Sequence, residues 1–254
     1  MKFLAIIPAR YSSSRFPGKP LAKICGEEMI VRVCRRVSEA GIECLVATDD
    51  QRIYECVERA GFHAVMTSEK CGSGTERVEE AYRNIGSDAD VVINVQGDEP
   101  FIHKEQIETL KNIFEQHPST KIATLVRRYT PESGFEGLKD PNLVKVVLAD
   151  SGKALYFSRS VIPYVRNIRE EDWLRNVVFH THIGIYAYTA VTLKNIVSLP
   201  VSTLEKAESL EQLRWLQNGY EIQTADSDYE TIGIDTPADL KAAEEYLRRL
   251  TEDR

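Results

Sequence analysis

The sequence predicts an α/β fold with a mainly parallel sheet and a smaller antiparallel insertion. In the first half of the chain, short apolar runs alternate with segments whose apolar residues recur at helical spacing. That alternation is typical of βαβ units in a doubly wound sheet. After about residue 127 the strands follow one another without helices between them. A length of 254 residues suits one large domain that carries an insertion.

The first half of the chain supplies the parallel strands. Strands are expected at the apolar runs 5–7, 43–48, 63–66, 91–95 and 122–126. Helices are expected between them, over 30–37, over 53–60, from about 75 and over 107–114. Gly41 and Gly61 end the first two helices. Ser73 and Glu76 have the spacing of a capping box, which places the start of the third helix near Thr75.

The second half predicts the insertion and the last elements. Residues 142–148 and 154–157 flank a turn at 150–152 and predict a hairpin, and 182–188 is an alternating strand. We therefore expect one domain from 1–127 plus 191–254 and an antiparallel insertion over 128–190. A helix over 204–213 and a strand over 221–224 follow. Thr236 is expected to cap the last helix, with Pro237 as its first residue.

The charge of the chain is unevenly distributed. The whole chain carries −7, which argues against nucleic acid as the main partner. Residues 1–26 contain no Asp or Glu and carry +5, so the remainder carries −12. An isolated pool of positive charge at the mouth of the first strand indicates a small anionic ligand.

The five cysteines and the N-terminus bear on the compartment. An odd number of cysteines without metal-ligand spacing predicts reduced thiols. The apolar run at the N-terminus breaks at Pro8 and Arg10, so it is too short for a signal peptide. No stretch is long enough to cross a membrane. We expect a cytoplasmic protein that binds no membrane.

The loop after the first strand is the strongest functional signal. Its small residues allow backbone amides to approach a phosphate chain, and its cations neutralise charge during phosphoryl-type transfer. It is not a Walker loop, because Ser13 and Pro20 stand where a glycine and a hydroxyl belong. The alternative is a solvated basic loop. The residues concerned are Ala9, Arg10, Ser12, Ser13, Ser14, Arg15, Gly18 and Lys19.

Two carboxylates are candidates for a magnesium site. Asp98 follows a buried strand at its carboxyl end, where ligands bind in open parallel sheets. Asp235 directly precedes the last helix. Taken singly, each reads equally well as a turn-forming or dipole-favoured acidic residue. Together near a triphosphate they predict Mg²⁺, which prefers hard oxygen ligands and substrate phosphates.

The segment GSGTER at residues 72–77 resembles a dinucleotide fingerprint, but Arg77 replaces its third glycine. We therefore reject a dinucleotide cofactor. A tight turn with Arg77 in the first helical turn suits contact with a base, ribose or phosphate. The alternative is an ordinary helix start.

Residues of the insertion and beyond are weaker candidates. His182, Gly184 and Tyr186 share one face of their strand, and the glycine leaves room for a ligand. A partly buried histidine with satisfied hydrogen bonds is the alternative. Arg159 follows the apolar ALYF run and suits a carboxylate, or is a surface arginine. Glu211 and Gln212 also read as a solvated helix face.

Seven segments occur in the order found in one enzyme family. The chain resembles the 3-deoxy-manno-octulosonate (Kdo) cytidylyltransferases, or CMP-Kdo synthetases, over its whole length. The first segment alone is shared by many sugar nucleotidyltransferases, whereas its combination with HIGIYAY and LEQLR is more specific. The segments are IIPARYSSSRFPGKPL, SGTER, NVQGDEP, ALYFSR, HIGIYAY, LEQLRWL and GIDTPADL.

The resemblance implies a Rossmann-like fold of the nucleotidyltransferase type, with an antiparallel subdomain that contributes to the sugar site and to a homodimer. It implies transfer of CMP from CTP to the anomeric hydroxyl of Kdo, with Mg²⁺, for lipopolysaccharide biosynthesis in the cytoplasm. The catalytic residues would be Arg15, Lys19 and Asp98, and the metal ligands Asp98 and Asp235. Nucleotide contacts would come from Ala9, Arg10, Ser13, Arg15, Lys19, Ser73, Arg77 and Gln96. Sugar contacts would come from Arg159, His182, Tyr186, Glu211 and Gln212.

Two other functions stay open at this stage. One is a cytidylyltransferase for another acid sugar, such as a sialate or an amino-modified Kdo. The other is a catalytically silent regulator that binds a nucleotide on the same fold. Lys19, Asp98 and Asp235 argue against a regulator, because mere binding does not require both metal carboxylates.

Overall fold

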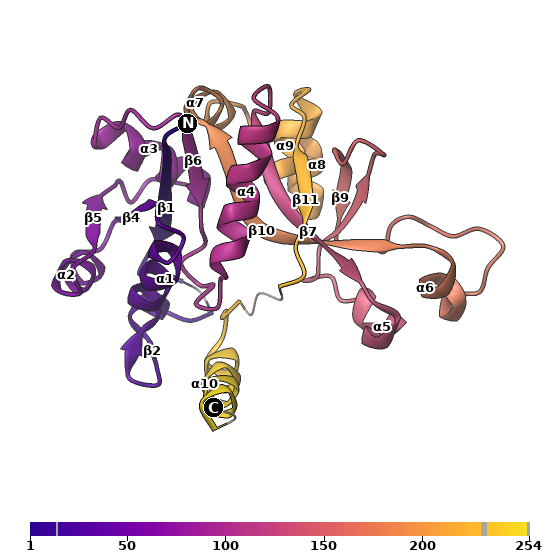
Figure 1. Ribbon diagram of the computed structural model, residues 1–254, viewed down its shortest axis with the longest axis horizontal. Helices are drawn as coiled ribbons and strands as arrows, with labels where there is room; N and C mark the ends of the chain where they lie inside the picture. Colours follow the sequence, from indigo (N-terminus) through magenta and orange to yellow (C-terminus); the bar gives the residue numbers. More distant parts are fainter. Residues whose placement is uncertain (14, 230–232, 253–254) are drawn as a thin grey trace. The chain divides into compact units, whose positions relative to one another are not determined.

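Four parallel strands, of which the first three along the order below are largely buried, form the sheet of the first part of the chain. They are β1 (Phe3–Ala9), β4 (Glu43–Thr48), β5 (His63–Met66) and β6 (Val91–Asn94), in the order β6-β1-β4-β5 (Figure 1). Ala5 lies opposite Cys44 on one side and Ile93 on the other. Four of the five predicted runs therefore form parallel strands, whereas the fifth, 122–126, pairs antiparallel with a later strand on one side and parallel with another on its other side.

This computed structural model describes residues 1–13, 15–229 and 233–252. Ser14, which the sequence places in the loop after β1, lies outside these residues. The chain divides into unit 1, made of Met1–Glu108 and Glu230–Arg254, and unit 2, made of Thr109–Tyr229. The predicted boundaries of the insertion, 128 and 190, differ from these. The role of 128–190 as a functional insertion stays a prediction.

The helices of unit 1 pack on its sheet. They are α1 (Met29–Ser38), α2 (Gln51–Arg59), α3 (Gly74–Asn84) and α4 (Lys104–Gln116), the last of which contains the boundary between the units. Helix α3 contacts all four strands, while α1 and α2 contact each other and β4. Ser73 caps α3 as predicted, since its side chain accepts a hydrogen bond from the Glu76 amide.

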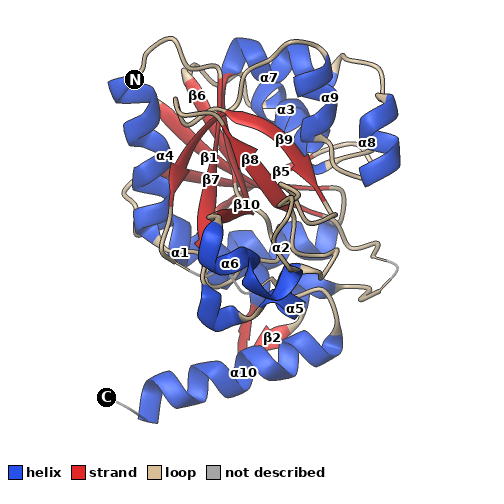
Figure 2. Ribbon diagram, turned by 90° about the vertical axis from the view of Figure 1, so that its right-hand side faces the viewer, coloured by secondary structure: helices blue, strands red, loops and turns tan. Residues whose placement is uncertain are grey.

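The last helix, α10 (Pro237–Glu252), joins unit 1 through a small apolar cluster. A short ribbon of β2 (Lys23–Ile24) and β3 (Glu27–Glu28) follows the 3₁₀ turn η1 (Lys19–Leu21). Ile24 and Met29 are fully buried with Ile234 and Ala243, so α10 packs beside β2 (Figure 2). The residue before the helix, Thr236, accepts from the Asp239 amide, as the predicted cap requires.

Unit 2 contains the antiparallel strands. They are β7 (Ile122–Tyr129), β8 (Lys145–Leu148), β9 (Ala154–Ser158), β10 (Phe179–Thr189) and β11 (Gln223–Asp226). Their order is β11-β7-β10-β8-β9, in which only the β11–β7 pair is parallel. The predicted hairpin is β8–β9. The α/β fold with parallel and antiparallel parts is thus confirmed.

A separate apolar cluster stabilises the residues between β7 and β10. Helices α5 (Phe135–Leu138) and α6 (Trp173–Asn176) lie there with the 3₁₀ turns η2 (Pro131–Ser133) and η3 (Glu170–Asp172). Leu138, Val165, Trp173 and Phe179 are buried together. Within unit 2, Figure 1 shows α5 and α6 away from α8 and α9.

The predicted helix over 204–213 is wrong in one respect, because it is two helices. Helix α7 (Ala190–Val197) precedes α8 (Thr203–Glu208) and α9 (Gln212–Gln217). Ser209 separates α8 from α9 with φ 51° and ψ 47°, the left-handed conformation that ends a helix. Apolar residues keep their helical spacing across this break, so the pattern alone indicates one continuous helix.

None of the helices in the described residues is long and apolar enough to cross a membrane. The five cysteines carry free thiols.

Candidate active site

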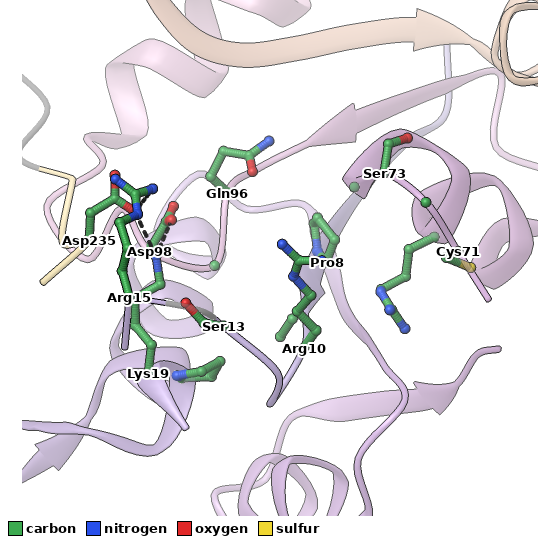
Figure 3. Close-up of a pocket in the computed structure, with 16 residues that line it drawn as sticks. Pro8, Arg10, Ser13, Arg15, Lys19, Cys71, Ser73, Gln96, Asp98 and Asp235 are labelled. Atoms are coloured by element: carbon green, nitrogen blue, oxygen red, sulfur yellow. Dashed lines mark hydrogen bonds and ion pairs between the residues drawn. The ribbon is translucent and has the colours of Figure 1, made fainter. Parts of the chain in front are cut away.

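The mouth of the parallel sheet in unit 1 contains a pocket of about 290 Å³. Its residues come from the loop after β1, the start of α3, the turn after β6 and the segment before α10. Figure 3 shows Arg15, Lys19, Asp98 and Asp235 at one end, and Ser73 and Cys71 at the other. The lining residues are Pro8, Ala9, Arg10, Ser13, Arg15, Lys19, Pro20, Cys71, Gly72, Ser73, Gly74, Arg77, Gln96, Gly97, Asp98 and Asp235.

The structure thus brings together every residue that the sequence assigned to the nucleotide and the metal. Six further lining residues were not predicted: Pro8, Pro20, Cys71, Gly72, Gly74 and Gly97. Gly97 carries a signal in the sequence, because it stands between a strand end and Asp98. A Cβ atom on Gly97 would lie 2.9 Å from the Pro8 carbonyl oxygen. Only glycine permits this close approach of two backbones at the pocket floor.

The loop after β1 is closed on itself. The Gly18 amide donates to the Tyr11 carbonyl at 2.9 Å. Gly18 has φ +71°, and a Cβ atom there would lie 3.0 Å from the Tyr11 ring. The Arg52 guanidinium lies over the same Tyr11 ring, 3.4 Å from its centroid. These contacts hold the small and basic residues of the loop around the pocket.

Lys19 joins the two predicted metal carboxylates. Its ammonium lies 2.6 Å from Asp98 Oδ2 and 3.1 Å from Asp235 Oδ1 (Figure 3). Arg15 Nη2 also lies 3.1 Å from Asp235 Oδ1. The side chains of Lys19 and Asp98 are only 13% and 32% exposed, so water screens this pair less than the more exposed pair of Arg15 and Asp235. The pocket therefore contains two cations and two carboxylates in mutual contact.

Backbone contacts keep the two carboxylates together. The Ile234 amide donates to the Asp98 carbonyl at 3.0 Å, which links the turn after β6 to the segment before α10. The amides of Asp235 and Thr236 donate to the Asp239 carboxylate in the first turn of α10. Asp98 and Asp235 are 137 positions apart in sequence. Hydrogen bonds of main-chain amides hold their two segments together, independent of the charges of the two side chains.

This donor set suits a hard divalent cation. Two carboxylates already converge on one cation, the Lys19 ammonium. Mg²⁺ is usually held by one or two carboxylates, with substrate phosphates and water as its other ligands. Among the described residues no cluster of three or more His, Cys, Asp or Glu side chains suits a metal ion. Asp98 and Asp235 are the pair that fits.

The N-terminus of α3 forms the opposite wall. Gly72, Ser73 and Gly74 line the pocket at the first turn of this eleven-residue helix. The Glu76 side chain accepts from the Gly72 amide at 2.7 Å, and Ser73 Oγ accepts from the Glu76 amide at 3.2 Å. Gln96, across the pocket, donates to Asn94 Oδ1 at 3.4 Å. A helix N-terminus beside amide and hydroxyl groups suits the polar parts of a nucleotide.

The five predicted sugar residues all belong to unit 2, whereas the pocket belongs to unit 1. His182 and Tyr186 lie on β10 with ring centroids 5.2 Å apart. Their rings meet although β10 shifts register between Ile183 and Tyr186. Thr124 Oγ1 lies 3.0 Å from His182 Nε2. Burial lowers the pKa of His182 to about 3, so its ring is neutral at physiological pH.

Arg159 makes contacts that the sequence did not predict. Its Nε donates to the Glu208 carbonyl at 2.6 Å, and its Nη1 to the Pro141 carbonyl at 2.8 Å. Its Nη2 donates to the Ser209 carbonyl at 3.3 Å. The Glu208 carboxylate in turn accepts from the Arg159 amide at 2.9 Å. Arg159 thereby fixes the end of α8, and its contact with a sugar stays a prediction.

The break at Ser209 also sets the place of Glu211 and Gln212. Glu211 is the residue before α9, and Gln212 is its first residue and 5% exposed. Glu211 Oε1 lies 4.0 Å from Arg214, whose guanidinium pairs with Glu205 at 2.6 Å. The sequence left open that Glu211 and Gln212 lie on a solvated helix face. For Gln212 this alternative is wrong, because its side chain is buried.

Comparison with known proteins agrees with this geometry. The sequence pattern of the cytidylyltransferase family matches residues 4–224. The 3-deoxy-manno-octulosonate cytidylyltransferase of Phocaeicola vulgatus is 54% identical over 98% of this chain and 98% of its own length. The protein of that name from Bacteroides thetaiotaomicron is 54% identical over 98% of this chain and 99% of its own.

A solved structure gives the same result. The structure of CMP:2-keto-3-deoxy-manno-octonic acid synthetase complexed with CTP superposes with a TM-score of 0.90 at 41% identity. The match covers 98% of this chain and 99% of that one. With a matching family pattern over most of its length and relatives of one name over nearly all of it, the chain belongs to the cytidylyltransferase family, and within it to the 3-deoxy-manno-octulosonate cytidylyltransferases.

Proposed function

We propose that this protein transfers the CMP group of CTP to the anomeric hydroxyl of 3-deoxy-manno-octulosonate, with release of pyrophosphate. The observation that carries the proposal is the 54% identity to two proteins named for this activity, over nearly the full length of all three chains. The product, CMP-Kdo, serves lipopolysaccharide biosynthesis.

CTP binds in the pocket of unit 1. Arg15 and Lys19 meet the β- and γ-phosphates, and Arg10 and the small residues Ala9 and Ser13 meet the rest of the chain of phosphates. Ser73, Arg77 and Gln96 hold the cytidine half at the other end of the pocket. The paired charges support this direction, because Arg15 and Lys19 lie with Asp98 and Asp235 at one end of the pocket and Ser73 lies at the other (Figure 3).

Mg²⁺ is the proposed cofactor, with Asp98 and Asp235 as its protein ligands. When bound, it neutralises phosphate charge and polarises the phosphorus–oxygen bonds of the nucleotide. Lys19 is the group most affected, because it now contacts both carboxylates. With the carboxylates holding the metal, the Lys19 ammonium would be available to the phosphates.

The chemistry is an in-line displacement at the α-phosphorus. The anomeric oxygen forms the new phosphorus–oxygen bond and loses its proton, while the bond to the β-phosphate oxygen breaks and pyrophosphate leaves. No covalent intermediate with the protein is required. Lys19 and Arg15 stabilise the negative charge that grows on the leaving pyrophosphate, and the closed loop after β1 orients the triphosphate.

The acceptor sugar binds to residues of unit 2, by the family resemblance. His182 and Tyr186 offer polar groups on adjoining rings, and Gln212 a buried amide. A guanidinium carries five N–H groups, of which Arg159 uses one on each of its three nitrogens for backbone carbonyls. The remaining ones suit the sugar carboxylate.

We further propose a cytoplasmic homodimer with contacts from the segment 128–190. Tyr164 is 77% exposed and Val178 57% exposed, and both belong to this segment. Large exposed apolar side chains are typical of interaction sites. Light scattering on a sizing column tests the dimer, and a monomeric Tyr164→Asp, Val178→Asp variant would support this surface. Cell fractionation tests the compartment.

Pyrophosphate release from CTP with a panel of acid sugars tests the activity. We expect turnover with Kdo and Mg²⁺, and none without metal. Preferred turnover of a sialate or an amino-modified Kdo would assign the enzyme to that sugar instead. CTP binding without turnover of any sugar would show a nucleotide-binding regulator and overturn the proposal.

A further inference from the structure

Arg77 lines the nucleotide pocket, and its guanidinium is bound by residues that do not line the pocket. It is 3% exposed. Its Nη2 lies 2.6 Å from Asp49 Oδ2, and the two side chains are 4% and 14% exposed. Its Nη1 donates to Thr67 Oγ1 at 2.7 Å and reaches the Ser68 carbonyl at 3.4 Å. Asp49 follows β4 and Thr67 follows β5, so two strand ends fix this guanidinium.

Donor counting shows what Arg77 has left for a ligand. A guanidinium carries five N–H donors and no acceptor. The contacts with Asp49, Thr67 and Ser68 account for three of them within the described residues. The Nε–H and the second Nη2–H remain. A buried arginine whose charge is already balanced can direct these two donors to a neutral acceptor rather than to a phosphate.

The two pyrimidine bases differ in what they offer such a pair of donors. Cytosine presents two adjacent acceptors, O2 and N3. Uracil presents O2 beside an N3–H donor, which an arginine cannot satisfy because it has no acceptor. A buried donor without a partner costs about 1–3 kcal/mol. An Arg77 guanidinium in a fixed position therefore favours binding of CTP over UTP. The preference is smaller if the guanidinium can move away from the uracil N3–H group.

We propose that Asp49 is a positioning residue that, with Thr67, fixes the Arg77 guanidinium for selection of cytosine over uracil. This inference rests on the proposed function, since it takes CTP as the bound nucleotide. Asp49 does not line the pocket. Its effect passes through the ion pair with Arg77.

The test compares CTP with UTP in the Asp49→Asn variant. Asparagine keeps the size and an acceptor oxygen but removes the charge. We expect the KM for CTP to rise about 10-fold to 100-fold, the loss typical of a good bidentate contact with a base. The inhibition constant of UTP, measured as a competitor of CTP, and the KM for Kdo should stay within about twofold of wild type. A role in folding alone would not separate CTP from UTP.

Asp50→Asn is a matched control. Asp50 is the next residue and pairs with Arg52 at the same 2.6 Å distance, but neither residue lines the pocket. Asparagine also caps a helix, so α2 should be retained. The ratio of the KM for CTP to the inhibition constant of UTP should not change in this variant.

Thr67→Val gives a second route if Asp49→Asn does not fold. Valine has the shape of threonine without the hydroxyl, so it removes one Arg77 contact and leaves the ion pair. The ratio of the KM for CTP to the inhibition constant of UTP should rise, as in Asp49→Asn, but by a smaller factor. Equal weakening of CTP and UTP, or no change of either, in a folded variant would overturn the inference. Absence of pyrophosphate release by the wild type with CTP and Kdo would instead overturn the proposed function.

Discussion

Lys19 places its ammonium 2.6 Å from the carboxylate of Asp98, so in this structure the lysine is the cation that the carboxylate binds. Asp235 contacts the same ammonium at 3.1 Å. An ammonium and a metal ion compete for the same oxygens. Metal binding to these carboxylates should therefore be weak until a nucleotide offers Lys19 other anions.

The first prediction concerns metal binding without a nucleotide. Lys19→Met should bind Mn²⁺ about tenfold more tightly than wild type, because loss of a unit charge within a few ångströms changes the binding free energy by at least about 1 kcal/mol. Titration calorimetry or the paramagnetic resonance signal of free Mn²⁺ measures this. The same variant should lose turnover of CTP, since Lys19 also neutralises the phosphates.

Lys23→Met is the control for the first prediction. Lys23 belongs to the same basic segment, pairs with Glu28 at 3.5 Å and does not line the pocket. Lys23→Met removes one positive charge from the chain, as Lys19→Met does. Tighter Mn²⁺ binding in both variants would show a general charge effect and contradict competition at the carboxylates.

The second prediction concerns Asp98 itself. Asp98→Asn should lower the turnover number by about 10²-fold to 10³-fold, the loss typical of one electrostatic partner in a transition state. The main-chain bond from Ile234 to the Asp98 carbonyl is independent of the side chain, so the fold should persist. Pyrophosphate release measures the effect. Asp88→Asn, which removes an exposed partner of Lys2, should retain activity, and near-normal turnover of Asp98→Asn would exclude its carboxylate from the mechanism.

The sequence predicts which residues share the pocket but not how they bind one another. Lys19, Asp98 and Asp235 each follow or precede a regular element, and the ends of parallel strands meet at one edge of a sheet. This topological rule places Asp98 at the same edge as the loop after β1, whereas Asp235 precedes a helix and is placed with them only by the family resemblance. It contains no information on charges in contact, so the ion pair of Lys19 with both carboxylates appears only in the structure.

Contacts distant in sequence explain what the sequence could not predict. Leu210 and Leu213 continue the apolar spacing of α8, yet Ser209 ends that helix. The Arg159 guanidinium binds the carbonyls that the break exposes, and this residue directly follows β9, some 50 residues earlier. Likewise Asp49 reads as the end of a strand, and its role emerges only when Arg77 is found against it.

The third prediction concerns pH. Burial lowers the pKa of His182 to about 3, whereas an unfolded histidine titrates near 6.5. Between these values the unfolded chain binds a proton that the folded chain does not, so the free energy of unfolding falls as pH falls. From pH 7 to pH 5 this group should cost at most about 2 kcal/mol.

Urea unfolding of His182→Gln at both pH values tests this. The variant should lose less stability than wild type on the same change, because glutamine does not titrate. His117→Gln, which alters an exposed histidine of unit 2, should follow the wild type. An unchanged pH dependence in His182→Gln would show that the ring is already solvated in the folded state.

The fourth prediction separates two roles of Arg159. Arg159→Ala removes hydrogen bonds to the carbonyls of Pro141, Glu208 and Ser209, and should lower the free energy of unfolding by about 1–3 kcal/mol. If the remaining N–H groups also hold the acceptor carboxylate, the KM for Kdo should rise about tenfold or more while that for CTP changes less than about twofold. Steady-state kinetics with each substrate varied in turn measures both.

Arg166→Ala, at an exposed arginine of the same unit, should leave both constants unchanged. An unchanged KM for Kdo in an Arg159→Ala variant of lowered stability would mean that this arginine only supports the end of α8, because its bonds to the carbonyls would then be lost without any effect on the acceptor.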